Sequence, residues 1–175
     1  MTPVPNYETE PLALDHKWDY NVPDPLVIAF GNHTYIIARS DDHGPVPGIF
    51  VIIRFESCEA FYYGVPDEES GMQAAIFGAT GPAVEIRNSK LVEEVIRRQD
   101  ELFRYLIAQH PSKYLERFKH FVLFFADQTV ECVARRVSTE LYHGSRAEAI
   151  NRLAISVRAL EPLPLPPKRR SETGA

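Results

Sequence analysis

The stretch "HFVLFFADQTVECVARRV", residues 120–137, decides how the middle of this chain is expected to fold. Two apolar runs flank the polar pair Asp127–Gln128, and their aromatic and β-branched residues favour β-strands. We expect the chain to reverse at this pair, so that the two runs form an antiparallel hairpin. Because side chains alternate along a strand, Cys132 would share a face with small apolar neighbours, and Glu131 would lie on the other face.

Three further segments have strand patterns. Residues 26–39, "LVIAFGNHTYIIAR", hold two β-rich runs around Gly31–Asn32, a dipeptide suited to a tight hairpin turn. Residues 49–55 and 60–65 flank "ESCE" and predict a second hairpin. Residues 83–88, "AVEIRN", predict a short strand at a sheet edge, where the neighbouring proline is tolerated.

Two segments have helical spacing of apolar residues. Residues 89–111 carry a continuous apolar stripe opposite charged residues, with Ser89 as the N-cap and Pro111 ending the helix. Residues 144–160 begin with Ser145 and Glu148 at capping-box spacing, which satisfies backbone N–H groups at a helix start. Both segments therefore predict amphipathic helices.

The order of these elements predicts an α+β fold, an antiparallel sheet of hairpins with two amphipathic helices packed on one face. Residues 1–25 contain five prolines, which predicts that residues 1–24 form an arm that lies on the body. Residues 25–160 form the single predicted domain. Residues 161–175 are proline-rich, then basic and polar, which predicts a disordered tail.

Composition excludes several classes of protein. A chain of 175 residues with 45% hydrophobic residues is expected to bury one core. Its net charge of -5 argues against nucleic-acid binding, and the sequence has no apolar stretch long enough for a membrane. Two cysteines are too few for a secreted disulfide framework, so we expect reduced thiols and a cytoplasmic protein.

The histidines have no metal-ligand spacing and the chain has no nucleotide-binding motif, so we expect no metal and no cofactor.

Glu131 and Cys132 are the first candidate catalytic residues. A free cysteine among aliphatic neighbours is most simply a packed core residue, with a nucleophile as the alternative. Glu131 is expected to form an ion pair with Arg135, which lies on the same face, or with His120 across the hairpin. A desolvated carboxylate with a raised pKa is the sharper alternative.

Cys58 lies between Glu56 and Glu59, whose negative charges are expected to raise the thiol pKa and to argue against an activated nucleophile.

Residues 62–71, "YYGVPDEESG", form a candidate binding loop. Its carboxylates, Asp67, Glu68 and Glu69, could attract a cation or a basic partner, although a solvated loop is the simpler interpretation. The alternation that a calcium-binding EF-hand loop requires is absent.

Three motifs together resemble a group of small bacterial proteins. The motifs are "FYYGVPDEES", "VEIRNSKLVEEV" and "HFVLFFADQTVECVA", and the resemblance spans residues 49–137. It implies a shared site but no particular activity. The matching positions are Tyr63, Gly64, Pro66, Asp67, Glu68, Asn88, Ser89, His120, Asp127, Thr129, Glu131 and Cys132. The chain departs from the pattern at Ala126, where another histidine would be expected, and this weakens any mechanism that needs that imidazole.

Three functions are compatible with these patterns. The first is a non-catalytic module that binds a protein or a small molecule through a sheet edge and the 62–71 loop; its predicted binding residues are Tyr63, Asp67, Glu68, Asn88 and Thr129. The second is a small acid–base or hydrolytic enzyme that uses His120, Asp127 and Glu131, with Cys132 as a further candidate. The third is a self-associating subunit, a homodimer. An enzyme needs these groups to converge on one cleft, whereas a binding module needs only an exposed patch.

Overall fold

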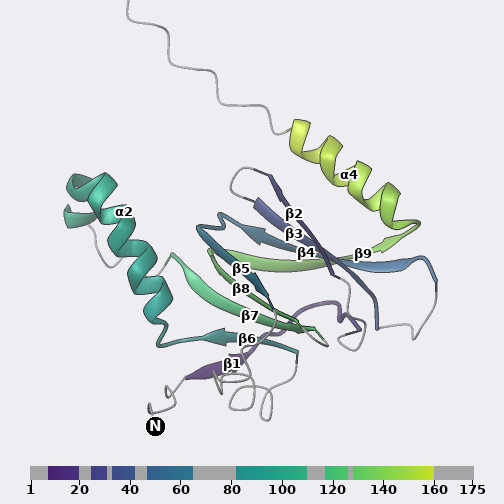
Figure 1. The fold of residues 1–175 in the computed structure, drawn as a ribbon, viewed down its shortest axis with the longest axis horizontal. Coiled ribbons are helices and arrows are strands. Elements are labelled where there is room, and N and C mark those ends of the chain that lie inside the picture. Colours follow the sequence, from purple (N-terminus) through teal and green to yellow (C-terminus); the bar gives the residue numbers. More distant parts are fainter. Residues whose placement is uncertain are drawn as a thin grey trace, which may run out of the picture.

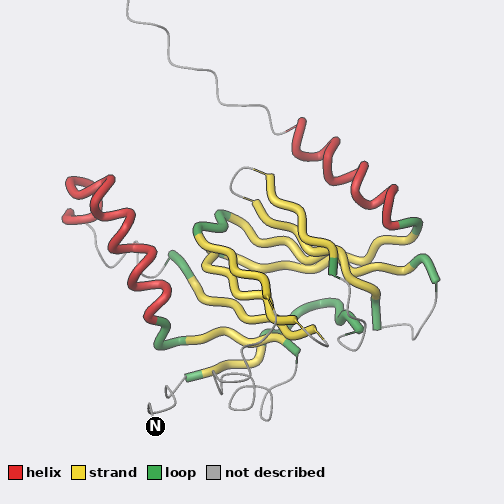
Figure 2. Tube along the Cα trace, in the orientation of Figure 1, coloured by secondary structure: helices red, strands yellow, loops and turns green. Residues whose placement is uncertain are grey.

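The structure is a computed structural model dominated by β-strands (Figures 1 and 2). It describes residues 8–19, 25–30, 33–41, 47–64, 82–109, 117–125 and 128–159, with the backbone alone at 100–109 and 157–159. The strands are β1 (Thr9–Pro11), β2 (Leu26–Phe30), β3 (His33–Arg39), β4 (Ile49–Glu56), β5 (Ala60–Gly64), β6 (Ala83–Ile86), β7 (Lys119–Phe125), β8 (Gln128–Ala134) and β9 (Arg136–His143). The helices are α2 (Lys90–Gln109) and α4 (Arg146–Ala159).

These strands form two antiparallel sheets, not one. The first sheet has the order β1-β6-β7-β8-β5 and the second β2-β3-β4-β9. The α+β prediction, a single layer of hairpins with both helices on one face, is therefore wrong. The reason is that the sheets bury their apolar faces against each other, so that the helices cover only what remains on the outside.

The main core lies between the two sheets. Its buried residues come from the inner faces of β3 and β4 in one sheet and of β6, β7 and β8 in the other. Trp18, which precedes β2, also belongs to this core, and its indole Nε1–H donates to the carbonyl of Phe124 at 3.1 Å. Part of the predicted proline-rich arm is thus built into the body: residues 9–11 form β1, which pairs with β6.

Two strands pass from one sheet to the other. The chain leaves β4 at Glu56, bends at residues 57–59 and enters β5 in the other sheet. β8 continues into β9 in the same way at Arg135, and the two bends lie side by side, because the Arg135 N–H donates to the Glu56 carbonyl at 2.9 Å. Ser57 has a φ of 54°, a left-handed conformation that sharpens this corner.

The hairpin predicted for residues 49–55 and 60–65 is therefore wrong. β4 pairs with β3 and β9, whereas β5 pairs with β8.

The two helices cover opposite outer faces (Figure 1). α2 packs Val92, Val95 and Ile96 against Phe118 and Val133 on the first sheet. On the second sheet, α4 places Ala149 and Leu153 against three buried residues of β3 and β4, namely Tyr35, Ile37 and Ile52. The layers are thus helix, sheet, sheet and helix.

Local features of the prediction are confirmed. Ser89 caps α2, since its Oγ accepts the Val92 N–H at 3.2 Å. The Ser145–Glu148 capping box is formed in both directions: the Ser145 N–H donates to Glu148 Oε2 at 2.7 Å, and the Glu148 N–H donates to Ser145 Oγ at 3.2 Å. The bonds that the Ser145 N–H and hydroxyl donate to the Glu148 carboxylate lower the pKa of this carboxyl below its ordinary value.

The strand predictions are correct in part. The pairs β2–β3 and β7–β8 form around the predicted turns, with Phe30 opposite His33 and Phe125 opposite Gln128. Gln128, predicted in the turn with Asp127, is the first residue of β8, and residues 31–32 and 126–127 lie outside the described residues. β6 was predicted at a sheet edge, but it lies between β1 and β7. β1 and β9 were not predicted.

Neither described helix has the length and hydropathy that crossing a membrane requires.

Candidate functional site

Polar side chains interrupt the apolar outer face of the first sheet where α2 begins. On β7, Val122 and Phe124 face outward, and His120 alternates with them on the same side. On β8, Glu131 lies on the outer side with Val133, while Cys132 faces the core between the sheets. His120 is directly opposite Val133 across the strand pair, so Glu131 is its diagonal neighbour.

Ser89 connects this sheet face to the helix. β6 ends at Ile86, residues 87–88 make a turn, and α2 starts at Lys90. Ser89 Oγ caps the helix and also lies 2.8 Å from His120 Nδ1. The hydroxyl can accept the backbone N–H and at the same time donate its proton to Nδ1, in the imidazole tautomer that carries its proton on Nε2. The helix cap therefore fixes the orientation of the ring.

His120 Nε2 faces Glu131 but is not fully satisfied by it. The Nε2 atom lies 3.3 Å from Glu131 Oε2, and the two side chains are 5% and 23% exposed respectively. Nevertheless Nε2 makes no hydrogen bond to any described residue, since the short distance is not matched by a bonding angle. A buried polar atom without a partner carries a penalty of about 1–3 kcal/mol. In the tautomer that carries the proton on Nε2, this N–H has only the 3.3 Å ion-pair contact with Glu131 and no hydrogen bond among the described residues.

A cavity of about 390 Å³ opens beside these residues. It lies between the end of β6, the start of α2 and the start of β7. Its walls are formed by Glu85, Ile86, Arg87, Asn88, Ser89, Val92, Glu93, Phe118, Lys119 and His120. The volume falls within the range of small-molecule sites.

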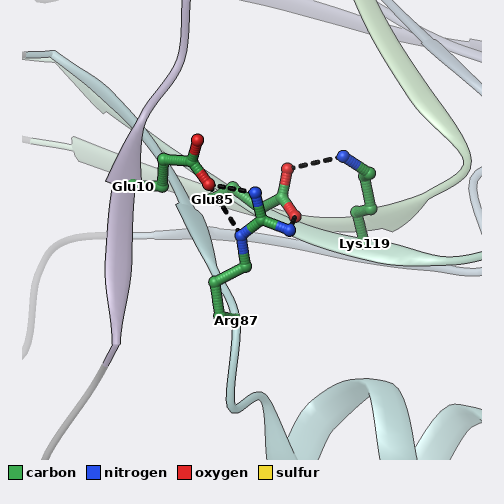
Figure 3. Close-up of polar contacts among 4 residues, drawn as sticks. All are labelled: Glu10, Glu85, Arg87 and Lys119. Carbon is green, nitrogen blue, oxygen red and sulfur yellow. Dashed lines mark hydrogen bonds and ion pairs between the residues drawn. The ribbon is translucent and has the colours of Figure 1, made fainter. Parts of the chain in front are cut away.

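Three charged residues of the cavity wall, Glu85, Arg87 and Lys119, form a balanced network of four charges with Glu10 of β1 (Figure 3). Lys119 Nζ lies 2.8 Å from Glu85 Oε2, and Arg87 Nη1 lies 3.3 Å from Glu85 Oε1. Arg87 Nε also donates to Glu10 Oε2 at 2.8 Å, and this bond is the largest cause of the raised pKa of Arg87. Glu85 is therefore neutralised by two cations, and β1 is fastened to the turn before α2.

The structure brings only some of the predicted residues together. His120 and Glu131 form a pair, as the cross-hairpin alternative proposed. The expected contact of Glu131 with Arg135 is replaced by a contact of the Arg135 guanidinium with the Phe118 ring, 5.8 Å from its centre. Asp67, Glu68 and Asp127 lie outside the described residues.

Of the three predicted binding residues that the structure describes, Asn88 lines the cavity, whereas Thr129 and Tyr63 do not. Asn88 lines the cavity, and its Oδ1 accepts the Glu8 N–H at 2.9 Å. Thr129 lies on the outer face of β8, and its buried Oγ1 makes no hydrogen bond within the described part of the chain. Tyr63 is exposed at the edge strand β5, where its hydroxyl bonds to the Gln128 side chain.

The cysteines occupy the opposite side of β8. Cys132 is fully buried with Val130 and Ala134, which confirms the predicted face. Its Sγ lies 3.0 Å from Cys58 Sγ. The expectation that neighbouring carboxylates would raise the pKa of Cys58 is wrong: the hydrogen bond with Cys132 lowers it to about 7, although Glu59 opposes this shift.

Sequence reasoning found only part of the cavity wall. Asn88, Ser89 and His120 were candidates, whereas their neighbours Arg87, Phe118 and Lys119 were not, because no local pattern indicates that these residues meet around a cavity. Among the described residues there is no group of three His, Cys, Asp or Glu side chains that could hold a metal ion. Comparison with family models, curated proteins and solved structures found no match.

Proposed function

We propose that this protein is a binding module for a small oxyanion, a carboxylate or a phosphate, which it holds in the cavity at the start of α2. The observation that carries this proposal is the buried His120 side chain on the cavity wall. Its Nδ1 is bonded to Ser89, while its Nε2 makes no hydrogen bond to any described residue. A buried polar group without a hydrogen bond suits a ligand that supplies an acceptor.

The charge of the ligand follows from the groups around the cavity. The N–H groups of a first helical turn have no acceptor within their helix, and the helix dipole favours negative charge there. The Asn88 amide is on the same walls, together with Arg87 and Lys119, whose charges Glu85 and Glu10 balance. The carboxylates of Glu93, on the wall, and of Glu131, 3.3 Å from Nε2, oppose an anion, so the attraction depends on the helix start and the neutral donors. A planar carboxylate and a tetrahedral phosphate both present oxygen acceptors to such donors.

This proposal keeps the module small, non-catalytic and cytoplasmic. The reducing compartment is supported by two cysteines that are not joined in a disulfide. We further propose that the bacterial proteins that the motifs resemble share this site, since Asn88, Ser89 and His120 are among the matching positions.

A titration of the backbone amide resonances tests the proposal. Acetate and inorganic phosphate are the two probes, and acetamide is the uncharged control for acetate. We expect saturable shifts of the Lys90 and Leu91 amides with an oxyanion and none with acetamide. The variant His120→Gln should weaken the response, while His143→Gln, an exposed histidine of β9, should keep it. Equal responses to acetate and acetamide, or no saturable response to either anion, would exclude the proposed ligand class.

A second candidate function is acyl hydrolysis, because Ser89, His120 and Glu131 lie in series. Such an order lets an imidazole take the hydroxyl proton while a carboxylate stabilises the resulting imidazolium. Ser89 Oγ would bond to the acyl carbon, and the alcohol would leave with the proton from His120. Water would then release the acid. The predicted partner Asp127 has no described position in this series.

A serine-directed fluorophosphonate probe separates the two candidates. Hydrolysis predicts a covalent mass increase on Ser89 that the variant Ser89→Ala abolishes. If the wild-type protein stays unlabelled while its amides still respond to an oxyanion, the site binds without reacting.

A further inference from the structure

We propose that Cys58 and Cys132 form a peroxide-sensitive thiol pair, in which Cys58 reacts with a hydroperoxide and Cys132 closes a disulfide with it. The inference does not depend on the oxyanion site, which lies on the other face of β8. It rests first on proximity, since the two sulfur atoms are 3.0 Å apart although the residues are 74 positions apart in the chain. A disulfide has a sulfur–sulfur distance near 2.05 Å, so the two atoms need to approach by only about 1 Å.

The two thiols are placed for different roles. Cys58 is partly exposed in the corner that joins β4 to β5, whereas Cys132 is buried in β8 between the sheets. A small peroxide can therefore meet Cys58 from solvent but not Cys132. The exposed member of the pair is the one that reacts first, and the buried member is held in contact to resolve the product.

The pKa values of the two thiols agree with these roles. The hydrogen bond with Cys132 lowers the pKa of Cys58 to about 7, with smaller support from hydrogen bonds with the Thr34 side chain and the Ala60 backbone. Burial of Cys58 and the charge of Glu59 act in the opposite direction. The pKa of Cys132 is raised, first by its bond to Cys58 and then by burial. The thiolate, which is the reactive species, therefore resides on Cys58.

The reaction balances in two steps. The Cys58 thiolate attacks the terminal oxygen of a hydroperoxide, ROOH; the O–O bond breaks, and a sulfenic acid and an alkoxide form, the latter taking a proton from water. Cys132 sulfur then bonds to Cys58 sulfur, and the hydroxyl leaves as water with the Cys132 proton. Two electrons pass from the two thiols to the peroxide. A dithiol reductant returns both residues to thiols by exchange.

The expected rate advantage is moderate. At pH 7 a thiol with a pKa of about 7 is about half ionised, which is roughly fiftyfold more thiolate than a thiol with a pKa near 9 carries. The lower basicity reduces intrinsic nucleophilicity by roughly eightfold at the usual Brønsted slope. A net advantage of roughly sixfold over an unperturbed thiol remains, and the rate should rise with pH up to about pH 7 and level off above it.

Mass spectrometry of the full chain tests the proposal. After exposure to hydrogen peroxide and alkylation under denaturing conditions, the wild-type monomer should lose two hydrogen masses and give one linked peptide pair, Cys58 with Cys132. The variant Cys132→Ala should instead accumulate a sulfenic acid that dimedone traps at Cys58. The variant Cys58→Ser should leave Cys132 unmodified under the same conditions.

Three results would overturn the proposal. The first is that both wild-type thiols can still be alkylated after excess peroxide, and the second is a disulfide that forms only between two chains. The third is that Cys132 is oxidised as much in the Cys58→Ser variant as in the wild-type protein. Cys132 lies in the core, so its variant is first checked for a native circular dichroism spectrum. If that variant does not fold, the wild-type chain under limiting peroxide still decides, because dimedone should label Cys58 before Cys132.

Discussion

A disulfide between Cys58 and Cys132 would close a chain loop of 74 residues, and this sets the size of its effect on stability. In the chain-entropy treatment, a loop of this length lowers the entropy of the unfolded state by roughly 15 cal/mol/K, which corresponds to about 4 kcal/mol at 25 °C. Strain in the native state reduces this amount, so that about 2 kcal/mol is a lower expectation. For a chain of 175 residues, these energies correspond to a rise in Tm of about 6–12 °C.

The assay is thermal unfolding followed by circular dichroism. Peroxide-treated wild-type protein is compared with the same protein in dithiothreitol, and the variant Cys58→Ser receives both treatments as the matched control. We expect the Tm to rise on oxidation only in the wild-type protein. An unchanged or lower Tm in protein that mass spectrometry shows to be disulfide-linked would refute the reasoning, because it would mean that the corner at residues 57–59 must be distorted to form the bond.

Three other predictions concern stability. Ser145→Ala removes one half of the α4 capping box and should lower the free energy of unfolding by about 1 kcal/mol in urea titrations; a loss below about 0.3 kcal/mol would mean that the cap contributes nothing. The lowered pKa of Glu148 means that its contribution is complete above its ordinary pKa near 4.5 and is lost as pH falls through the lower folded pKa. The urea midpoints of wild type and Glu148→Gln should therefore differ at pH 7 and converge at pH 2, and a constant difference would contradict this sign. Trp18→Phe removes the indole donor to the buried Phe124 carbonyl and should cost about 2 kcal/mol, while an unchanged urea midpoint would show that the arm is not fastened there.

Local chemistry made part of the fold predictable. Ser89, Ser145 and Glu148 signal helix starts through spacings of three residues, and Gly31–Asn32 signals a turn between two adjacent strands. The corner at residues 57–59 is similar in composition to a hairpin turn, so the local sequence does not show whether the chain makes a hairpin or passes to another sheet. What distinguishes them is the pairing of β5 with β8, whose residues lie about seventy positions further along the chain.

The candidate site likewise has a part that local sequence patterns predict and a part that depends on contacts between distant segments. His120 and Glu131 were within reach of sequence reasoning, because they are diagonal neighbours in one hairpin. The contact of Ser89 with His120 spans 31 residues and depends on where α2 meets the sheet. No local pattern reports such a contact. The choice of Arg135 as partner of Glu131 failed because strand periodicity gives the face of a side chain but not the neighbours, such as Phe118, that compete for it.

The central claim is that Ser89 holds the His120 ring so that Nε2 can donate to an oxyanion. The most direct measurement is the 15N shift of the His120 side-chain nitrogens during titration with acetate and with inorganic phosphate. We predict a saturable shift of Nε2 in the wild-type protein, a weaker one in Ser89→Ala, and only a bulk salt effect at the exposed His143. A His120 Nε2 shift that follows His143 throughout both titrations would contradict the claim.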